Sequence, residues 1–229
     1  MNEDTLSRSG KRAISCKWVY RLKHNANGTK RFKARLVIKG YEQHYGIDFE
    51  ETFAPVAKFV TLRVLFALAA QFDWEIEQID VVTAFLIPEL HEEVYMDQPE
   101  GFTKSSASGG TLYCRLRKCL YGLKQAPYKW YMDIDNYLIN FLGLTCSSED
   151  HNLYISISAN IILLLYIDDI QLFSPSKKAI NSLKSKLMMK YRIVDLRPAS
   201  QFLSLEILRN CQARMLYLHQ SSYIEHILK

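Results

Sequence analysis

An apolar run that ends in two adjacent aspartates constrains this chain more than any other feature. Residues 161–167 read IILLLYI, and Asp168 and Asp169 follow directly. Apolar residues resume at once with Ile170, so we expect the chain to turn back on itself as a tight hairpin with both aspartates at its tip. Neighbouring carboxylates repel each other at the end of a buried strand, and a divalent cation relieves that repulsion. A solvated acidic turn is the alternative, which this motif alone leaves open.

A third carboxylate, Asp80, extends the motif. It lies in QIDVVTAFL, residues 78–86, after the apolar positions Ile76 and Ile79. We therefore expect Asp80 on a strand within residues 74–86 that runs into a turn or short helix. Together with the hairpin pair it makes a set of three hard oxygen ligands suited to Mg²⁺. Two Mg²⁺ ions in such a set can activate a hydroxyl group and stabilise a leaving pyrophosphate.

Charge is segregated along the chain although its net value is only +5. Residues 11–40 carry ten Lys or Arg and no acid, and residues 101–130 carry six and no acid. Residues 71–100 carry nine Asp or Glu and no base. Such blocks predict an acidic centre between basic surfaces, and basic surfaces bind polyanions by releasing counterions. Chance clustering that disperses in the folded protein is the alternative.

Composition excludes several classes of protein. The chain is 48% hydrophobic and 23% charged, as packed globular proteins are. Its polar N-terminus has no apolar signal segment, and its apolar runs are too short to span a bilayer, so we expect an intracellular protein with no membrane partner. The five cysteines show no Cys-x-x-Cys spacing, which predicts buried reduced thiols and not a disulfide framework or a zinc site.

Two alternating runs, residues 17–23 and 31–40, flank Asn27 and Gly28 and predict a β-hairpin. Because strand side chains alternate, the second run has one cationic face and one face that we expect to pack. The cationic face holds Lys33, Arg35, Val37 and Lys39, and the packed face holds Phe32, Ala34, Leu36 and Ile38.

The remaining periodicities predict helices and further strands. The helices are expected from about Thr61, from Pro127 to Gly143, after Ser176, and at a capping box of Ser222 with Glu225. The strands are expected at 153–157, 161–173, 202–208 and 215–219. These elements indicate the α+β class: an antiparallel sheet backed by helices, with a basic hairpin subdomain before it.

Eight ordered blocks, from about Lys17 to Leu228, resemble the reverse transcriptase of copia-type long-terminal-repeat retrotransposons. The blocks are KARLVIKGYEQ, GIDFEETFAPVAKFVTLR, IDVVTAFL, HEEVYMDQPEGF, CLYGLKQAP, LLLYIDDI, FLSLEI and LHQSSYIEHIL. The resemblance implies an RNA-directed DNA polymerase with a right-hand polymerase fold. It implies a flexible tail at 1–12, fingers at 13–72, palm at 73–102 and 131–210, a fingers loop over the nucleotide at 103–130, and the primer-grip end with a truncated thumb at 211–229.

The resemblance also assigns roles to single residues. Catalysis and metal binding fall on Asp80, Asp168 and Asp169, with the backbone carbonyl of Val81 as a further metal ligand. Phe85 falls where an aromatic ring lies under the incoming sugar and excludes a 2′-hydroxyl; a core phenylalanine is the alternative.

Substrate contacts are implied for the fingers. Tyr121, Gly122, Lys124 and Gln125 would contact the nucleotide and the template base. Lys33 and Arg35 are candidates for the triphosphate, with template phosphate or solvent as alternatives. Residues 203–207 would form the primer grip.

The implied cofactor is a pair of Mg²⁺ ions, with Mn²⁺ as an alternative. The implied partners are dNTPs, a primed RNA or DNA template, and the integrase and RNase H segments of a Pol polyprotein. The implied location is the cytoplasm, in virus-like particles, and/or the nucleus.

Four departures from the family pattern bear on activity: Ile87-Pro88 for Asn-Gly, Tyr128 for arginine, and Arg197 and Ser204 for glycines. They leave a second reading open, a catalytically inactive remnant that binds nucleic acid. A third reading, an integrase-like or RNase H-like nuclease, fits poorly, because such sites do not place two adjacent carboxylates on a hairpin tip.

Overall fold

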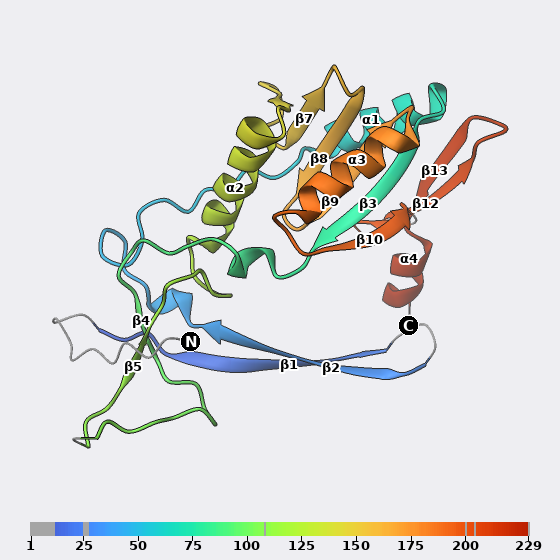
Figure 1. Cartoon of the computed structure of the whole chain (residues 1–229). Coiled ribbons are helices and arrows are strands. Elements are labelled where there is room, and N and C mark those ends of the chain that lie inside the picture. The colour runs from blue at the N-terminus through green and yellow to red at the C-terminus, as the bar shows by residue number, and fades with distance from the viewer. Residues whose placement is uncertain (1–11, 25–27, 108, 200, 204, 229) are drawn as a thin grey trace. The chain divides into compact units, whose positions relative to one another are not determined.

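The computed structural model describes residues 12–24, 28–107, 109–199, 201–203 and 205–228. The chain divides into two compact units (Figure 1). Unit 1 comprises Met1–Ala54 and Ala84–Asp133, and unit 2 comprises Pro55–Thr83 and Ile134–Lys229. The expected flexible tail, except for Arg12, and Asn27 of the expected turn lie outside the described residues.

Unit 1 contains the predicted hairpin. Strands β1 (Cys16–His24) and β2 (Lys30–Ile38) pair antiparallel along their whole length. Arg21 faces Lys33 and Val19 faces Arg35 across the pair, and directly opposed residues share a face. The register therefore confirms that one face of the ribbon is cationic.

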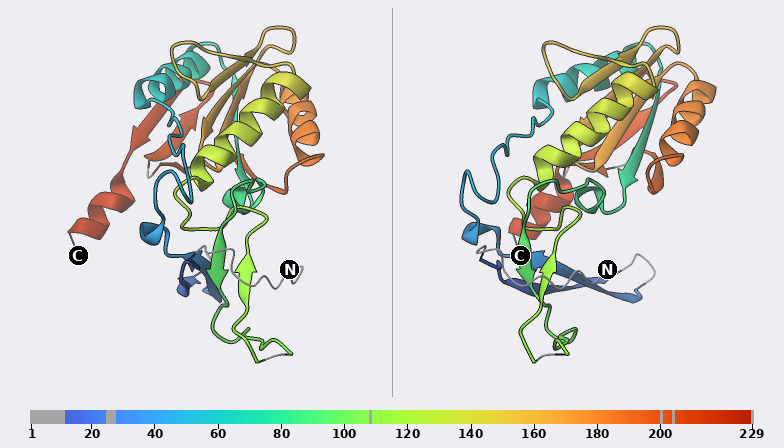
Figure 2. Two further views of the ribbon diagram at one scale, coloured as in Figure 1. Left: turned by 90° about the vertical axis from the view of Figure 1, so that its left-hand side faces the viewer. Right: turned by 60° about the vertical axis from the view of Figure 1, so that its left-hand side comes forward.

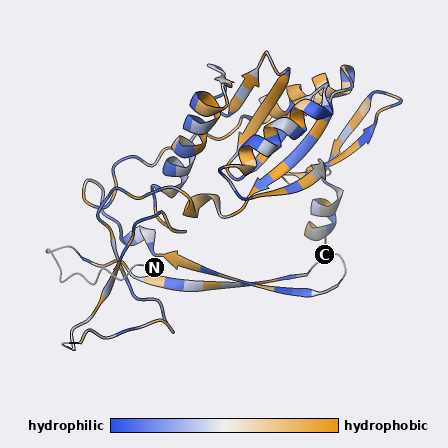
Figure 3. Cartoon of the chain, viewed as in Figure 1, coloured by the Kyte–Doolittle hydropathy of each residue, from blue (hydrophilic) through white to orange (hydrophobic). Residues whose placement is uncertain are grey.

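The opposite face of the ribbon packs only at one end. Ile38 belongs to the core of unit 1, and the partly buried Leu36 packs against that core. Phe32, by contrast, is 83% exposed. The prediction that this whole face packs is wrong for its outer half, because the core reaches only the end of β2. Figure 3 shows the same change, with hydrophilic segments on the ribbon toward its turn.

The rest of unit 1 is built from short elements. A 3₁₀ turn at Gly40–Glu42 follows β2, and another lies at Ala84–Leu86. Strands β4 (Tyr95–Asp97) and β5 (Tyr113–Arg115) form a second two-stranded pair. The core of the unit gathers eight buried side chains from these elements and from the segments next to them: Ile14, Ile38, Leu90, Val94, Met96, Cys119, Leu123 and Ala126.

Unit 2 is organised around a six-stranded antiparallel sheet in the order β10-β3-β9-β8-β7-β6. The strands are β3 (Glu75–Val81), β6 (Thr145–Cys146), β7 (Leu153–Ser156), β8 (Ile161–Tyr166), β9 (Asp169–Ser174) and β10 (Ile193–Pro198). The predicted antiparallel sheet is thus confirmed, whereas β6 and β10 were not predicted.

Helices α1 (Phe59–Gln71) and α3 (Lys177–Met188) lie on opposite sides of this sheet (Figure 2). Helix α1 buries Leu62, Leu65, Phe66 and Ala69, with the Phe66 ring edge-on to Phe173 of β9 at 5.7 Å. Helix α1 had been grouped with the predicted fingers at 13–72, but it packs within unit 2. Helix α3 begins after Ser176, whose hydroxyl accepts a hydrogen bond from the Ala179 amide at 3.3 Å, as predicted.

Helix α2 (Ala126–Asn136) starts next to the predicted Pro127 and continues as a π-helical turn, Tyr137–Phe141. Gly143, with φ +69°, follows the end of this turn. The left-handed conformation there favours glycine, so the predicted helix stop is confirmed. No helix among the described residues is long and apolar enough to cross a membrane.

A three-stranded sheet and a short helix complete unit 2. The strands are β11 (Gln201–Phe202), β12 (Leu205–Asn210) and β13 (Met215–His219), and the helix is α4 (Ser221–Ile227). The single strand predicted at 202–208 is wrong, because Phe202 pairs with Leu205 and Leu203 has a left-handed φ of +50°. Ser204 and the side chain of Arg197 lie outside the described residues.

The predicted capping box is also wrong in position. Helix α4 begins at Ser221, with Gln220 as its N-cap residue. The side chain of Ser222 lies outside the part of the chain that the structure describes. The predicted class is confirmed at the level of a mixed fold with an antiparallel sheet and helices on its faces.

Candidate active site

The β8–β9 hairpin carries the two adjacent aspartates. Tyr166 ends β8 and pairs with Asp169, the first residue of β9. The turn is therefore Ile167-Asp168, and the prediction that both aspartates occupy the tip is wrong by one residue. Asp168 is exposed in the turn, whereas Asp169 is half-buried on the strand.

Ile167 has a left-handed φ of +59°. A two-residue hairpin turn with positive φ at its first central position usually has glycine there. A β-branched residue in this conformation is strained, and such strain persists only where the surrounding structure imposes it. The pairing of β8 with β9 on both sides of the turn holds Ile167 in place and so fixes the backbone that carries Asp168.

Strand β3 brings the third carboxylate to this hairpin. Asp80 lies directly opposite Asp169 in the β3–β9 register, so the two side chains share one face of the sheet. The next amide along β3, from Val81, donates a hydrogen bond to the Asp168 carbonyl oxygen at 2.8 Å. The structure thus brings together all three aspartates predicted from the sequence at one end of the β3–β9 pair.

The electrostatics of Asp169 reflect this crowding. Burial raises the pKa of the Asp169 carboxyl above its ordinary value, and the charges of Asp168 and Asp80 raise it further. A hydrogen bond from Gln78 opposes these effects. The Gln78 amide nitrogen donates to Asp169 Oδ1 at 3.1 Å. Gln78 was not predicted as a site residue, and its signal was its place two residues before Asp80 on the same strand face.

The chemistry of this donor set fits a hard divalent cation. Carboxylate oxygens are the ligands that Mg²⁺ prefers, and a cation would relieve the repulsion that raises the pKa of Asp169. Within the described ranges, no group of three or more His, Cys, Asp or Glu side chains is already gathered closely enough to hold a metal ion. The structure therefore supplies the donors at one end of the β3–β9 pair without a finished coordination cage.

A second group of predicted residues meets in unit 1. The Arg35 guanidinium lies over the Tyr121 ring, 5.7 Å from its centroid. The Phe85 ring stands edge-on to the same tyrosine at a centroid distance of 6.2 Å. The Tyr121 carbonyl oxygen accepts a hydrogen bond from the Ile38 amide at 2.9 Å, which ties this loop to the end of β2.

Comparison with known proteins decides the family. Residues 6–229 match the family model described as reverse transcriptase (RNA-dependent DNA polymerase). The chain belongs to this family. The match confirms the resemblance found in the sequence blocks, and the family's enzymes are nucleotidyltransferases.

Relatives of this reverse transcriptase domain are much longer proteins. It is 45% identical over 223 residues to the Retrovirus-related Pol polyprotein from transposon TNT 1-94 of Nicotiana tabacum, covering 96% of this chain and 17% of that protein. It is 37% identical over 218 residues to the Retrovirus-related Pol polyprotein from transposon RE1 of Arabidopsis thaliana, covering 94% and 14%. The chain thus spans about a sixth of the length of the first relative.

Among solved structures, the reverse transcriptase domain is similar to the foamy viral protease-reverse transcriptase in complex with double-stranded DNA. The TM-score is 0.45 and the sequence identity 14%, over 93% of this chain and 34% of that chain.

Gly122 of the reverse transcriptase domain is required by close backbone packing. It has φ +96°, and a Cβ atom there would collide with the Ile38 carbonyl oxygen. A Cβ atom on Gly40 would in turn collide with the Gly122 carbonyl oxygen. Both glycines are needed for the predicted nucleotide loop to lie against the end of β2.

Two other predicted contacts in this loop serve the fold of unit 1. Gln125 is 0% exposed; its oxygen accepts from Gln43 at 3.0 Å and its nitrogen donates to the Asp48 carbonyl at 2.9 Å. This burial contradicts the predicted contact between Gln125 and a nucleotide. Lys124 is exposed but anchored, since its ammonium donates to the Gln43 carbonyl at 3.3 Å and lies 4.8 Å from the Phe49 ring centroid.

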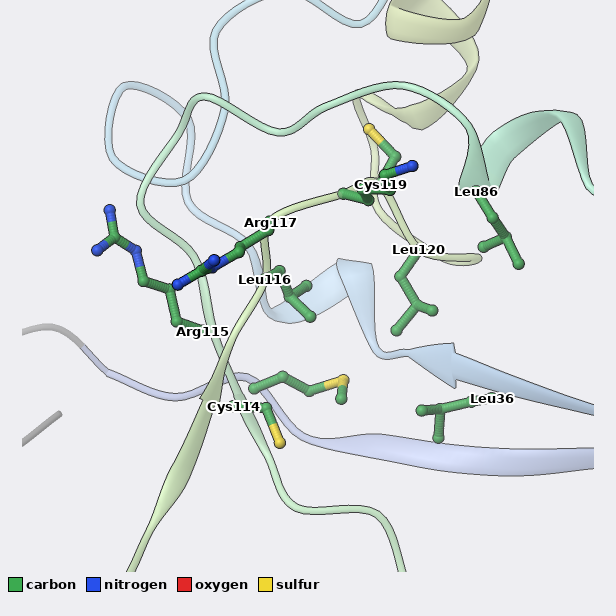
Figure 4. Close-up of a pocket in the computed structure, with 10 residues that line it drawn as sticks. Leu36, Leu86, Cys114, Arg115, Leu116, Arg117, Cys119 and Leu120 are labelled. Atoms are coloured by element: carbon green, nitrogen blue, oxygen red, sulfur yellow. The ribbon is translucent and has the colours of Figure 1, made fainter. Parts of the chain in front are cut away.

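A cavity of about 340 Å³ lies next to the loop within unit 1 (Figure 4). Leu36, Leu86 and Leu120 are among the apolar residues that line it. Arg115 and Arg117 also border it, but their charged ends extend away from the leucines. The cavity is therefore an apolar gap beside the core and not a phosphate-binding site.

Proposed function

We propose that this chain is an RNA-directed DNA polymerase domain that adds deoxynucleotides to a primer 3′-hydroxyl on an RNA or DNA template. In this proposal unit 2 contains the palm and unit 1 the fingers of a right-hand polymerase fold. One observation carries the proposal: Asp80 lies directly opposite Asp169, next to the turn that holds Asp168. Membership of the reverse transcriptase family supports it.

In the proposed reaction the primer 3′-oxygen forms a bond to the α-phosphorus of the dNTP, and the bond to the bridging oxygen of the pyrophosphate breaks. Asp80, Asp168 and Asp169 would hold two Mg²⁺ ions, with the Val81 carbonyl as a further ligand. The ions, when bound, would favour deprotonation of the hydroxyl and neutralise the leaving pyrophosphate. The protein itself would provide position and charge, because phosphoryl transfer requires little covalent chemistry from side chains.

The fingers residues of the proposal bind the rest of the nucleotide. Lys33 and Arg35 share the cationic face of β2 and would bind triphosphate oxygens, which guanidinium and ammonium groups recognise well. The stack of Arg35 on Tyr121 and the contact of Phe85 with Tyr121 support a common nucleotide platform. Phe85 would lie under the sugar and exclude a 2′-hydroxyl.

The primer grip of the proposal is the segment of residues 203–207, which contains the start of β12. Leu205 and Ile207 are buried in the cluster that also holds Leu62 and Phe66 of α1, which anchors the start of β12 to the palm. Helix α4 would begin the thumb. The other proposed partners are the integrase and RNase H segments of a Pol polyprotein, consistent with the polyprotein names of the relatives.

A second candidate function is nucleic-acid binding without turnover. The cationic face of β1–β2 favours it, since six bases share that face independently of the aspartates: Lys17, Arg21, Lys23, Arg31, Lys33 and Arg35.

Primer extension on a DNA or RNA template with Mg²⁺ tests the proposal. The wild-type chain should extend the primer, and Asp168→Asn should abolish extension while leaving binding of the primed template unchanged. Asp73→Asn is the matched control, because Asp73 forms a surface ion pair with Arg209 at 2.7 Å and such pairs contribute little. Salt-sensitive binding without extension by the wild-type chain would support the second candidate.

A further inference from the structure

Gln78 is the polar neighbour that reaches the catalytic carboxylates from the palm sheet itself. It lies on β3 two residues before Asp80, so both side chains are on the same face. Gln78 is 6% exposed, and its amide nitrogen donates to Asp169 Oδ1 at 3.1 Å. Strand β3 thus supplies one carboxylate of the site and also the group that contacts the facing carboxylate.

The contact has a directional consequence for Asp169. A carboxylate accepts through two oxygens, and the amide of Gln78 engages Oδ1. A buried hydrogen bond to an ionised oxygen restrains rotation of the carboxylate, since its donor sits on a strand with few alternative positions. Oδ2 is then left for a cation in an orientation set before the cation arrives.

We propose that Gln78 is a positioning residue for the metal site: it orients the Asp169 carboxylate for divalent cation binding through its hydrogen bond to Oδ1. This inference rests on the proposed function. Groups that orient metal ligands without touching the metal change metal affinity about 10–100-fold when they are removed.

Gln171 provides a matched comparison on the neighbouring strand. It lies directly opposite Gln78 in the β3–β9 register, on the same face as Asp169 and two residues after it. It is 0% exposed, but neither atom of its amide forms a hydrogen bond with any residue that the structure describes. Two buried glutamines therefore lie side by side on this face: Gln78 forms a hydrogen bond with Asp169, and Gln171 does not.

The test measures binding of Mn²⁺ alone to the full chain, without nucleic acid, by electron paramagnetic resonance of the free ion. Gln78→Met removes the donor with little change of size and should weaken Mn²⁺ binding about 10–100-fold. Gln171→Met should leave Mn²⁺ binding as in the wild type. In primer extension, Gln78→Met should need more Mg²⁺ for half-maximal rate and approach the wild-type rate at saturating Mg²⁺.

The outcomes separate this inference from the proposed function. Wild-type binding of Mn²⁺ that Asp168→Asn weakens but Gln78→Met does not would overturn the inference and leave the polymerase proposal standing. Equal weakening by Gln78→Met and Gln171→Met would show a packing effect and also overturn it. Absence of wild-type Mn²⁺ binding would contradict both. If Gln78→Met does not fold, Gln78→Asn keeps an amide one methylene too short to reach Oδ1 and should weaken Mn²⁺ binding as well.

Discussion

Glu77 and Asp80 lie three residues apart on β3 and therefore point to opposite faces of the same sheet. On the face covered by α3, the buried Glu77 carboxylate meets the ammonium groups of Lys184 and Lys177. Lys184 also binds Asp195 at 2.7 Å. On the other face, the Asp169 carboxylate opposite Asp80 meets an amide from Gln78 and the charges of two further carboxylates.

The two faces differ in how their carboxylates are neutralised. Buried carboxylates are stable when paired with cations, and the α3 face provides those cations from the chain itself. Around Asp169, burial raises the pKa of the carboxyl and like charges raise it further, an arrangement that an external divalent cation would stabilise. The first face neutralises its buried carboxylate with lysines of the chain, whereas the carboxylate end of the second face is suited to binding a metal ion.

The largest expected effect tests the paired face. Lys184→Met keeps much of the side-chain volume but removes the buried cation of Glu77, which then has the more exposed Lys177 as its remaining ion-pair partner among the described residues. Breaking a buried ion pair by removing one partner destabilises by about 3–5 kcal/mol. Urea denaturation should show that loss in the free energy of unfolding.

Lys177→Met is the control for this measurement. The Lys177 side chain is 54% exposed, so its loss should change the free energy of unfolding by about 1 kcal/mol or less. Equal effects of the two lysine substitutions would mean that the α3 face does not depend on the buried pair.

A smaller effect of opposite sign is expected next to the site. Gln171 carries a fully buried amide without a hydrogen bond to the described part of the chain, and such an unsatisfied group costs about 1–3 kcal/mol. Gln171→Met replaces it with an apolar side chain of similar shape and should raise the free energy of unfolding by up to about that amount. A loss of stability in urea denaturation would show that the amide is satisfied in solution.

The smallest effect concerns pH in metal-free buffer. The pKa of Asp169 is raised above its ordinary value of 3.8 in the folded protein, so folding favours the protonated form. Wild type should therefore lose stability relative to Asp169→Asn as pH rises from 3.8 through the raised pKa, and the two should differ little from this cause below 3.8. Thermal unfolding of both proteins across this pH range checks the direction of the change in stability. Above this range, added Mg²⁺ should reduce the difference in stability between wild type and Asp169→Asn.

Sequence alone predicted which three carboxylates meet at one end of the β3–β9 pair because their signals are local. Asp168 and Asp169 follow an apolar run, and Asp80 follows the apolar positions Ile76 and Ile79 of a strand. The exact turn was missed by one residue, since an apolar run does not show where pairing stops. The position of the turn is set by the pairing of Tyr166 with Asp169 across β8 and β9.

Roles that depend on distant partners were not accessible in the same way. Gln125 looked like a nucleotide contact, but its amide is taken up by Gln43 and Asp48, about 80 residues earlier in the chain. Gln78 looked like an ordinary strand residue until its contact with Asp169, 91 residues later, was known. The break between β11 and β12 depends on the left-handed backbone conformation of Leu203. Leucine rarely adopts this conformation, so the residue type does not predict it.

An anomalous difference map from a crystal of this chain soaked in Mn²⁺ would test the three-aspartate metal site directly. We expect a peak in contact with the carboxylates of Asp80, Asp168 and Asp169 that is absent in Asp168→Asn crystals. A map with no peak at these carboxylates, or an Asp80 side chain turned to the Glu77 face of the sheet, would contradict it.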